Sequence, residues 1–455
     1  MFKSVNPATG KQIATHPELT KSEIETKLGK AASAYKAWRQ TGIDERTKLL
    51  IKIADQYEAN KERLARMATE EMGKTLKTSI AEVEKCAALF RHYAKAGPAM
   101  LEPERWELAS GGTAEARWLP QGPVLAIMPW NYPYWQAVRF LAPTILAGNV
   151  ALLKHASIVQ GVAGLMEDMM RDAGAPEGLF QNLAIKSDAV ADIIADDRVT
   201  AVTLTGSEGA GQAVAKQAGE QLKKVVLELG GSDPFIVMPS ADLDKAVKHA
   251  VKGRTQNTGQ SCICAKRMIV HTDIYDDFMD RFGEAMKAVK AGDPMDDATD
   301  MGPLSSLDQR DTVIDQLEQA KKNGARLLFG GERLAGDGAY LTAGILTDVD
   351  PEGPVASEEI FGPIAMVFRA KDIDDAIHLA NNIPFGLGSS VWTRDKAEQE
   401  RFIRDIEAGM TAVNQMLASA PEAPFGGIKR SGHGRELARF GLREFMNLKT
   451  VMLPE

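Results

Sequence analysis

The sequence predicts an α/β protein with two doubly wound lobes. Its N-terminal region is rich in Ala, Lys and Glu, with apolar residues three and four positions apart, and two later series alternate short apolar runs with amphipathic segments. Strands that alternate with helices are typical of βαβ units, which build parallel sheets. Such sheets bind ligands at the carboxyl ends of their strands, so we expect a site in the cleft between the lobes.

The expected elements follow the chain in order. Residues 20–97 are predicted to be helical. The first alternating series, which also has a helix after Trp135, contains apolar or amphipathic segments at 124–128, 150–153, 162–172, 180–184, 193–194, 201–204, 209–218 and 225–229. The second series has apolar runs at 234–238, 268–270, 326–329, 364–368, 389–392 and 411–414. Residues 448–453 resemble a strand without a local partner, which we expect to pair with a distant strand or with another subunit.

Composition narrows the class of protein. A chain of 455 residues exceeds the ~250–300 residues at which single cores stop growing, so two or three domains are expected. The net charge of −8 provides no basic surface for nucleic acid or an anionic membrane, and no apolar run approaches the ~18 residues of a membrane span. Three cysteines argue against a disulfide scaffold and favour the cytoplasm. Neither the seven histidines nor the cysteines have metal-ligand spacing, so no metal site is expected.

Cys262 is the first candidate for chemistry. It follows Gly259 in the polar turn Asn-Thr-Gly-Gln-Ser-Cys262-Ile-Cys264. Backbone amides in such a turn lower a thiol pKa and stabilise an oxyanion. A buried, inert cysteine fits the local sequence equally well. Cys86 lies in a regular helical pattern and is expected in the core.

Three other segments carry polar residues beside predicted strands. Glu228 stands between leucines at a strand end, where partial burial raises a carboxyl pKa and makes a general base, although it could also face water. Asn131, after Trp130, could donate its amide to an oxyanion, or the two prolines around it could simply form a turn. Gly206 and Ser207 open a helix but do not fit the GxGxxG or phosphate-loop spacing, so they indicate only an anion-accepting helix N-terminus.

Taken together, these segments resemble the aldehyde dehydrogenase superfamily along essentially the whole chain. The motifs that carry the resemblance occur in the expected order and are Pro-Trp-Asn131, the strand end at Lys154, Thr-Gly206-Ser207, Leu-Glu228-Leu-Gly-Gly, Asn-Thr-Gly-Gln-Ser-Cys262, Glu358-Glu359-Ile-Phe361-Gly-Pro and Pro424-Phe-Gly-Gly-Ile-Lys.

The resemblance implies a role for each motif. Cys262 would attack the aldehyde, Asn131 and the Cys262 backbone amide would hold the oxyanion, and Glu228 would activate water to hydrolyse the thioester. The residues implied in binding NAD or NADP are Trp130, Lys154, Ser157, Gly206, Ser207, Glu359 and Phe361. From the net charge and the lack of a long apolar run, we also expect the protein to bind no nucleic acid and no membrane.

The resemblance also implies three domains. A cofactor-binding domain would comprise residues 1–101 and 121–230, and a catalytic domain would comprise residues 231–430. Residues 102–120 and 431–455 would form a small β element for assembly into a homodimer or homotetramer.

Within the superfamily, the chain most resembles bacterial succinate-semialdehyde dehydrogenases, through Gly-Gly-Ser232-Asp233-Pro-Phe and Leu-Leu-Lys154-His155-Ala156-Ser157. The distal carboxylate of such a substrate needs a cationic or hydroxyl-rich clamp. Arg139, one helical turn after Trp135 and Gln136, is the first candidate; Ser261 and Ser419 are the second. A surface or interdomain salt bridge is the alternative for Arg139.

Ser157 predicts a preference for NADP. Relatives that prefer NAD commonly carry a glutamate three residues beyond the lysine, and that carboxylate would repel a 2′-phosphate; serine removes the repulsion. NAD remains a second candidate. Cys264 resembles a cysteine that forms a disulfide with the nucleophile in some relatives, or it is a small buried residue.

The sequence leaves four alternatives to this function. A broad-specificity dehydrogenase of short uncharged aldehydes would share all these motifs. A CoA-acylating dehydrogenase conflicts with the hydrolytic motif at Glu228. A thiol esterase leaves Ser207, Glu359 and Phe361 unexplained, and a non-catalytic relative conflicts with the intact catalytic set.

Overall fold

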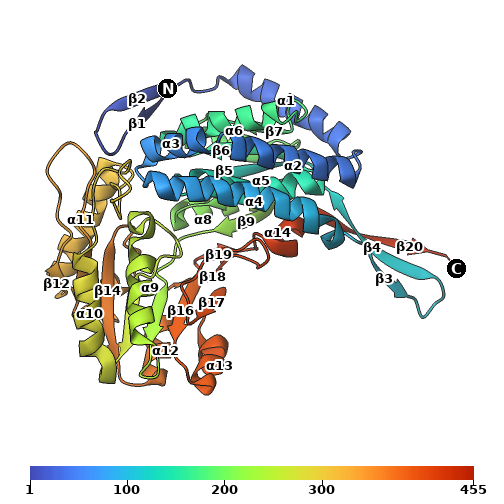
Figure 1. Ribbon diagram of the computed structural model, residues 1–455. Coiled ribbons are helices and arrows are strands. Elements are labelled where there is room, and N and C mark those ends of the chain that lie inside the picture. Colours follow the sequence, from blue (N-terminus) through green and yellow to red (C-terminus); the bar gives the residue numbers. More distant parts are fainter. Residues whose placement is uncertain (455) are drawn as a thin grey trace.

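The computed structural model describes residues 1–454, which form two large sheets flanked by helices and a three-stranded arm that extends away from them (Figure 1). This confirms the predicted α/β fold with two parallel, doubly wound lobes and a small β element. Among the described residues, no helix is long and apolar enough to cross a membrane.

The N-terminal region is helical, as predicted, with elements α1 (Lys21–Trp38), α2 (Ile43–Ala59), α3 (Lys61–Met72) and α4 (Leu76–Met100). A capping box starts α1, because Thr20 accepts from the Glu23 amide and the Glu23 carboxylate accepts from the Thr20 amide. Gly73 ends α3 in the left-handed conformation, at φ +85°. A hairpin of β1 (Phe2–Val5) and β2 (Gln12–His16) precedes the helices; it was not predicted.

The first sheet has the strand order β19-β9-β8-β5-β6-β7. Its strands are β5 (Pro123–Met128), β6 (Val150–His155), β7 (Phe180–Asn182), β8 (Ala201–Thr205), β9 (Lys224–Glu228) and β19 (Gly432–His433), and its helices are α5 (Pro133–Ala147), α6 (Gln160–Asp172), α7 (Val190–Ala195) and α8 (Glu208–Glu220). The apolar pair at 193–194 lies in α7. Only β19 is antiparallel to its neighbour. Strand β5 pairs with β6 on one side and with β8 on the other. The order in which the chain adds strands to the sheet therefore changes direction at β5, and open parallel sheets bind ligands at such a point.

The second sheet has the order β12-β13-β14-β11-β10-β16-β17, parallel except for β12. Its strands are β10 (Pro234–Val237), β11 (Arg267–His271), β12 (Arg326–Phe329), β13 (Gly344–Thr347), β14 (Ile364–Ala370), β16 (Gly388–Trp392) and β17 (Met410–Val413), and its helices are α9 (Leu243–Thr255), α10 (Tyr275–Lys287), α11 (Leu307–Lys322), α12 (Ile373–Asn381) and α13 (Lys396–Asp405). Successive side chains of β10 enter different cores, with Phe235 and Val237 on one face and Ile236 on the other. The sheet is therefore buried on both faces.

The arm consists of β20 (Met446–Leu453), β4 (Thr113–Pro120) and β3 (Glu104–Glu107). The terminal strand predicted to lack a local partner pairs antiparallel with all eight residues of β4. Figure 1 shows the arm projecting from the helical layer of the first sheet. Trp106, Leu448 and Met452 on the arm are exposed.

The end of the chain returns from the second sheet to the first. A short pair, β15 (Phe385–Gly386) with β18 (Ile428–Lys429), precedes β19, which adds to the edge of the first sheet at β9. Helix α14 (Ala438–Arg443) then packs against α5 and α4. The chain crosses from β9 to β10 at residues 229–233, but the predicted division into domains stays a prediction.

Candidate active site

The cysteine loop has an unusual backbone conformation. Asn257, Thr258 and Gly259 are left-handed in succession, with φ of 50°, 56° and 75°. This conformation is strained for a β-branched residue such as Thr258. A Cβ on Gly259 would lie 2.3 Å from the carbonyl oxygen of Gly362, so only glycine allows this approach. The loop therefore packs directly against the segment that follows Phe361.

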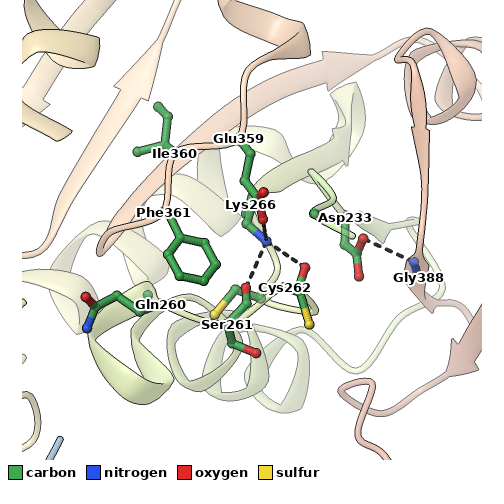
Figure 2. A network of polar contacts seen from close by, with 12 residues as sticks. Asp233, Gln260, Ser261, Cys262, Lys266, Glu359, Ile360, Phe361 and Gly388 are labelled. Atoms are coloured by element: carbon green, nitrogen blue, oxygen red, sulfur yellow. Dashed lines mark hydrogen bonds and ion pairs between the residues drawn. The ribbon is translucent and has the colours of Figure 1, made fainter. Parts of the chain in front are cut away.

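Two buried cations hold this loop in place. Arg254 Nη2 donates to the carbonyl oxygens of Gly259 at 2.8 Å and Gly362 at 2.6 Å. Figure 2 shows the second cation, Lys266, whose Nζ donates to the carbonyl oxygens of Ser261 at 2.9 Å and Cys262 at 2.7 Å.

Lys266 also links the loop to Glu359. Its Nζ forms an ion pair with Glu359 Oε1 at 3.1 Å, and the lysine side chain is fully buried (Figure 2). A Cβ on Gly230 would lie 2.1 Å from Glu359 Oε2, so this glycine makes room for the carboxylate. Burial raises the pKa of the neighbouring Asp233 to about 7, while the charge of Lys266 opposes the rise. Sequence reasoning missed Lys266, although a cation four residues after Cys262 was a visible signal.

Cys262 is a free thiol at the point where two cavities meet. Burial raises the pKa of its thiol to about 12, whereas the positive charges of Arg139 and Lys266 act in the opposite direction. The thiol is therefore protonated at neutral pH in this state. Additional positive charge or a proton acceptor is needed to form the thiolate.

The cavity on one side of Cys262, which we name the α8 cavity, has a volume of about 260 Å³. Its lining brings together the loops after β5, β8 and β9, as expected at the reversal of strand order, and includes Trp130, Asn131, Gly206, Ser207, Glu228, Cys262, Glu359 and Phe361. The rings of Trp130 and Phe361 meet edge to face at 5.8 Å. Ser207 caps α8, with its Oγ accepting from the Ala210 amide. Eight of the predicted site residues therefore line this one cavity.

Asn131 is held with its amide beside the cysteine loop. Its side chain is buried, and Nδ2 donates to the Gln260 carbonyl oxygen at 3.0 Å. The Asn131 carbonyl oxygen accepts from Asn257 Nδ2 at 2.7 Å. Since a primary amide has two protons, the second proton of Nδ2 remains available to an oxygen atom at Cys262.

Glu228 is buried at the end of β9, and neither carboxylate oxygen has a hydrogen-bond partner among residues 1–454. Burial raises its pKa well above the ordinary value; Glu436 adds to the rise, and Arg139 and Arg435 oppose it. Gly426, at φ +152°, leaves the space for this carboxyl, because a Cβ there would lie 2.6 Å from Glu228 Oε1. A carboxyl with a raised pKa on the wall of a cavity has the properties of a general base.

Lys154 and Ser157 lie at the carboxyl end of β6, the strand beside β5. Lys154 is half-buried, and burial lowers its pKa. Ser157 is exposed and begins a 3-10 turn. These residues lie at the same edge of the sheet as the α8 cavity, one strand farther along.

The cavity on the other side of Cys262, which we name the α4 cavity, has a volume of about 310 Å³. All five predicted substrate residues contribute to its lining: Trp135, Gln136, Arg139, Ser261 and Ser419.

Arg139 is paired within the α4 cavity. Its guanidinium forms an ion pair with the buried Glu436 at 2.7 Å, stacks over Phe425 at 4.5 Å and hydrogen-bonds to Gln136 Oε1. The salt bridge that was the alternative for Arg139 is thus present.

Sequence reasoning missed Lys85, a further cation of the α4 cavity. Its Nζ donates to Ser419 Oγ at 2.8 Å and lies 4.1 Å from the centre of the Trp135 ring. Cys264 is buried nearby as a free thiol, with its Sγ 3.8 Å from the Gln256 carbonyl oxygen, and its redox role stays a prediction.

Comparison with known proteins agrees with this geometry. Residues 1–451 match the profile of the Aldehyde dehydrogenase family. A Mycobacterium avium protein named succinate-semialdehyde dehydrogenase (NADP+) is 51% identical over 99% of this chain and 96% of its own length. A Mycobacterium tuberculosis protein named succinate-semialdehyde dehydrogenase (NADP+) 1 is 50% identical over 99% of both chains.

Solved structures give the same result. A succinic semialdehyde dehydrogenase from Streptococcus pyogenes, in complex with NADP+, has a TM-score of 0.98 at 36% identity and covers 100% of both chains. A succinate-semialdehyde dehydrogenase from Burkholderia pseudomallei has a TM-score of 0.97 at 32% identity, covering 100% of this chain and 94% of its own. The family resemblance expected from the sequence is confirmed: the chain belongs to the aldehyde dehydrogenase family.

Proposed function

We propose that the protein oxidises succinate semialdehyde to succinate with NADP, through a thioester on Cys262. The observation that carries this proposal is the roughly half identity, over almost the whole chain, with two mycobacterial proteins named for that reaction. The cations and hydroxyls that line the α4 cavity beside Cys262 support a substrate with a distal carboxylate.

The residues around Cys262 would divide the reaction into two easier steps. The Cys262 thiol first releases its proton to solvent, and the resulting thiolate adds to the aldehyde carbon while Asn131 Nδ2 and the Cys262 backbone amide stabilise the oxyanion. NADP, when bound, supplies a nicotinamide ring that accepts the hydride. Glu228 then takes a proton from a water molecule, whose oxygen attacks the thioester carbon, and the carboxylic acid leaves as the thiol re-forms. Aldehyde, water and NADP+ thus give carboxylate, NADPH and two protons.

The α8 cavity suits the nicotinamide and pyrophosphate part of a dinucleotide cofactor. Thr205 Oγ1, at the end of β8, is buried without a hydrogen-bond partner among the described residues, and it adjoins the N-terminus of α8, a helix of 13 residues. A helix N-terminus of this kind binds a pyrophosphate. We assign the pyrophosphate to Gly206 and Ser207, and the nicotinamide ribose and ring to Glu359, Phe361 and Trp130.

We assign the adenosine ribose to Lys154 and Ser157. Lys154 has no ion-pair partner among the described residues, and Ser157 brings no negative charge to the exposed turn after β6. A 2′-phosphate at this position would be attracted by Lys154 and not repelled by a carboxylate. The arrangement therefore favours NADP over NAD.

The test is a comparison of initial rates of reduced-nicotinamide formation. Succinate semialdehyde and butanal, which carries a methyl group in place of the carboxylate, are each assayed with NADP and with NAD. We expect the highest kcat/KM for succinate semialdehyde with NADP. A higher kcat/KM for butanal would instead support the broad-specificity alternative, which the apolar walls formed by Trp135 and Phe425 favour. Stimulation by CoA would support an acylating enzyme, and ester cleavage without nucleotide would support an esterase.

We also propose that the protein is a cytoplasmic homodimer or homotetramer, joined through the arm. Strand β20 forms one edge of the arm sheet, and Leu448 and Met452 on it are 52% and 64% exposed. An edge strand with exposed apolar side chains favours pairing with a second copy. Light scattering on the intact protein and on Leu448→Lys tests this assembly; a monomeric parent protein would refute it.

A further inference from the structure

The α4 cavity contains a cation that lacks an acidic partner. Lys85, on α4, is half-buried, and among residues 1–454 no carboxylate lies within ion-pair distance of its Nζ. Its one hydrogen bond goes to Ser419 Oγ, and its ammonium lies over the Trp135 ring. A partly desolvated ammonium without a counter-ion is energetically costly, and an anionic ligand would relieve this cost.

The neighbouring cations are either ion-paired or exposed to solvent. Arg139 is ion-paired with Glu436, and Lys74 is ion-paired with Glu82, one turn before Lys85 along α4. Lys77 and Lys252, which also line the cavity, are exposed to solvent. Lys85 is therefore the one cation among the five in this lining that is both sheltered and free of an acid.

We infer that Lys85, together with Ser419, binds the distal carboxylate of the aldehyde substrate. This inference rests on the proposed function and names its specificity-determining residue. The ammonium and the hydroxyl each donate to the carboxylate, while Trp135 forms an apolar surface under the ammonium and beside the substrate chain. Arg139, which is ion-paired with Glu436 and bonded to Gln136, lines the same cavity.

The inference has a consequence for pH dependence. Burial and the positive charges of Arg139 and Lys74 lower the pKa of Lys85 to about 8, while Cys86 and Glu82 oppose the shift. As the pH rises through about 8, the ammonium of the free enzyme loses its proton. Preference for a carboxylated aldehyde should therefore fall above that pH.

The experiment compares Lys85→Met with the parent enzyme, using succinate semialdehyde and butanal with NADP. The measured quantity is the ratio of the two kcat/KM values, which cancels effects on the thiol or the cofactor. We expect the ratio to fall by about tenfold or more in Lys85→Met, mainly through the KM for succinate semialdehyde. Lys85→Arg should keep most of the preference and retain it to higher pH.

Lys95→Met is the matched control, since Lys95 is an exposed lysine on the same helix and outside the cavity lining. It should leave the ratio unchanged. If Lys85→Met does not fold, the ratio measured on the parent enzyme between pH 6.5 and 9.5 tests the same point. A ratio that is unaffected by both Lys85→Met and pH overturns the inference, whereas a parent enzyme without preference for succinate semialdehyde overturns the proposed function.

Discussion

The two cavities that meet at Cys262 differ in charge and in the kind of residue they hold. The α8 cavity contains two carboxyl groups, Glu228 and Glu359, at the reversal of strand order in the first sheet. The α4 cavity has apolar walls and several cations, and its one carboxyl group, Glu82, is ion-paired with Lys74. Lys85 is half-buried there without an acidic partner. Under the proposed function, we expect chemistry common to all aldehydes on the α8 side and selection among aldehydes on the α4 side. The predictions below test that separation.

Cys262→Ala should have the largest effect, because its thiol belongs to both cavities. We expect kcat/KM to fall by at least ~10³-fold for charged and uncharged aldehydes alike, since the variant has no nucleophile. The loss is measured as the rate of reduced-nicotinamide formation. The control is Cys86→Ala, which changes a buried cysteine on α4. Retained dehydrogenase activity would refute the thioester mechanism.

Glu228→Gln should slow turnover by about 10²-fold or more for every aldehyde, because under the proposed mechanism it removes the base that activates water. Hydride transfer precedes this step, so rapid mixing should show a burst of NADPH of about one equivalent per active site. Glu208→Gln, a change of the same kind on α8, should keep the parent turnover. Slow turnover without a burst would indicate that Glu228 acts before the thioester forms rather than in its hydrolysis.

Lys266→Met should weaken the link between the cysteine loop and Glu359. The change leaves Glu359 without its ion-pair partner and two carbonyl oxygens without a donor, which destabilises the folded protein by about 3 kcal/mol. Urea unfolding measures the loss, and the KM for NADP should rise in the same variant. Lys287→Met, which removes an exposed lysine from α10, is the control. Unchanged stability and cofactor KM would show that the ion pair has no positioning role.

Ser157→Glu should have the smallest effect and leave the aldehyde preference intact. The new carboxylate would repel a 2′-phosphate beside Lys154, so the ratio of kcat/KM with NADP to kcat/KM with NAD should fall by about tenfold. Ser157→Ala separates the added charge from the lost hydroxyl. An unchanged cofactor ratio in Ser157→Glu would contradict the assignment of this turn to the adenosine ribose.

The sequence predicted the parts of the fold whose patterns are local. The amphipathic helices and the buried parallel strands, such as β5 and β10, were predicted because each is a continuous apolar or periodic run. The strands β1, β2 and β13 were not predicted, and β3 was expected only as part of the β element that the family resemblance implied for residues 102–120. They are short or carry mixed side chains, and their pairing depends on a distant or turn-connected partner that periodicity does not reveal.

The site residues divide in the same way, into those that belong to local sequence patterns and those that only folding brings together. Cys262, Glu228 and Asn131 belong to contiguous motifs, and the structure places them around one cavity. Lys85 was missed because it lies in an ordinary helical pattern, and only folding brings it to Ser419. The role inferred for Lys85 depends on its lack of an acidic partner. That lack is a property of the packed structure and cannot be read from any one segment of the sequence.

The first sheet can be completed only late in synthesis, because its edge strand β19 lies near the end of the chain. Because β19 completes the first sheet after the entire second sheet has been translated, the first lobe cannot reach its final structure while the ribosome is still making the second. Pairing over such a long separation in the chain is slow, and until it occurs the edge of β9 stays open to other strands. The two lobes are thus expected to mature together, and a chain stopped before β19 should aggregate rather than yield a functional cofactor lobe.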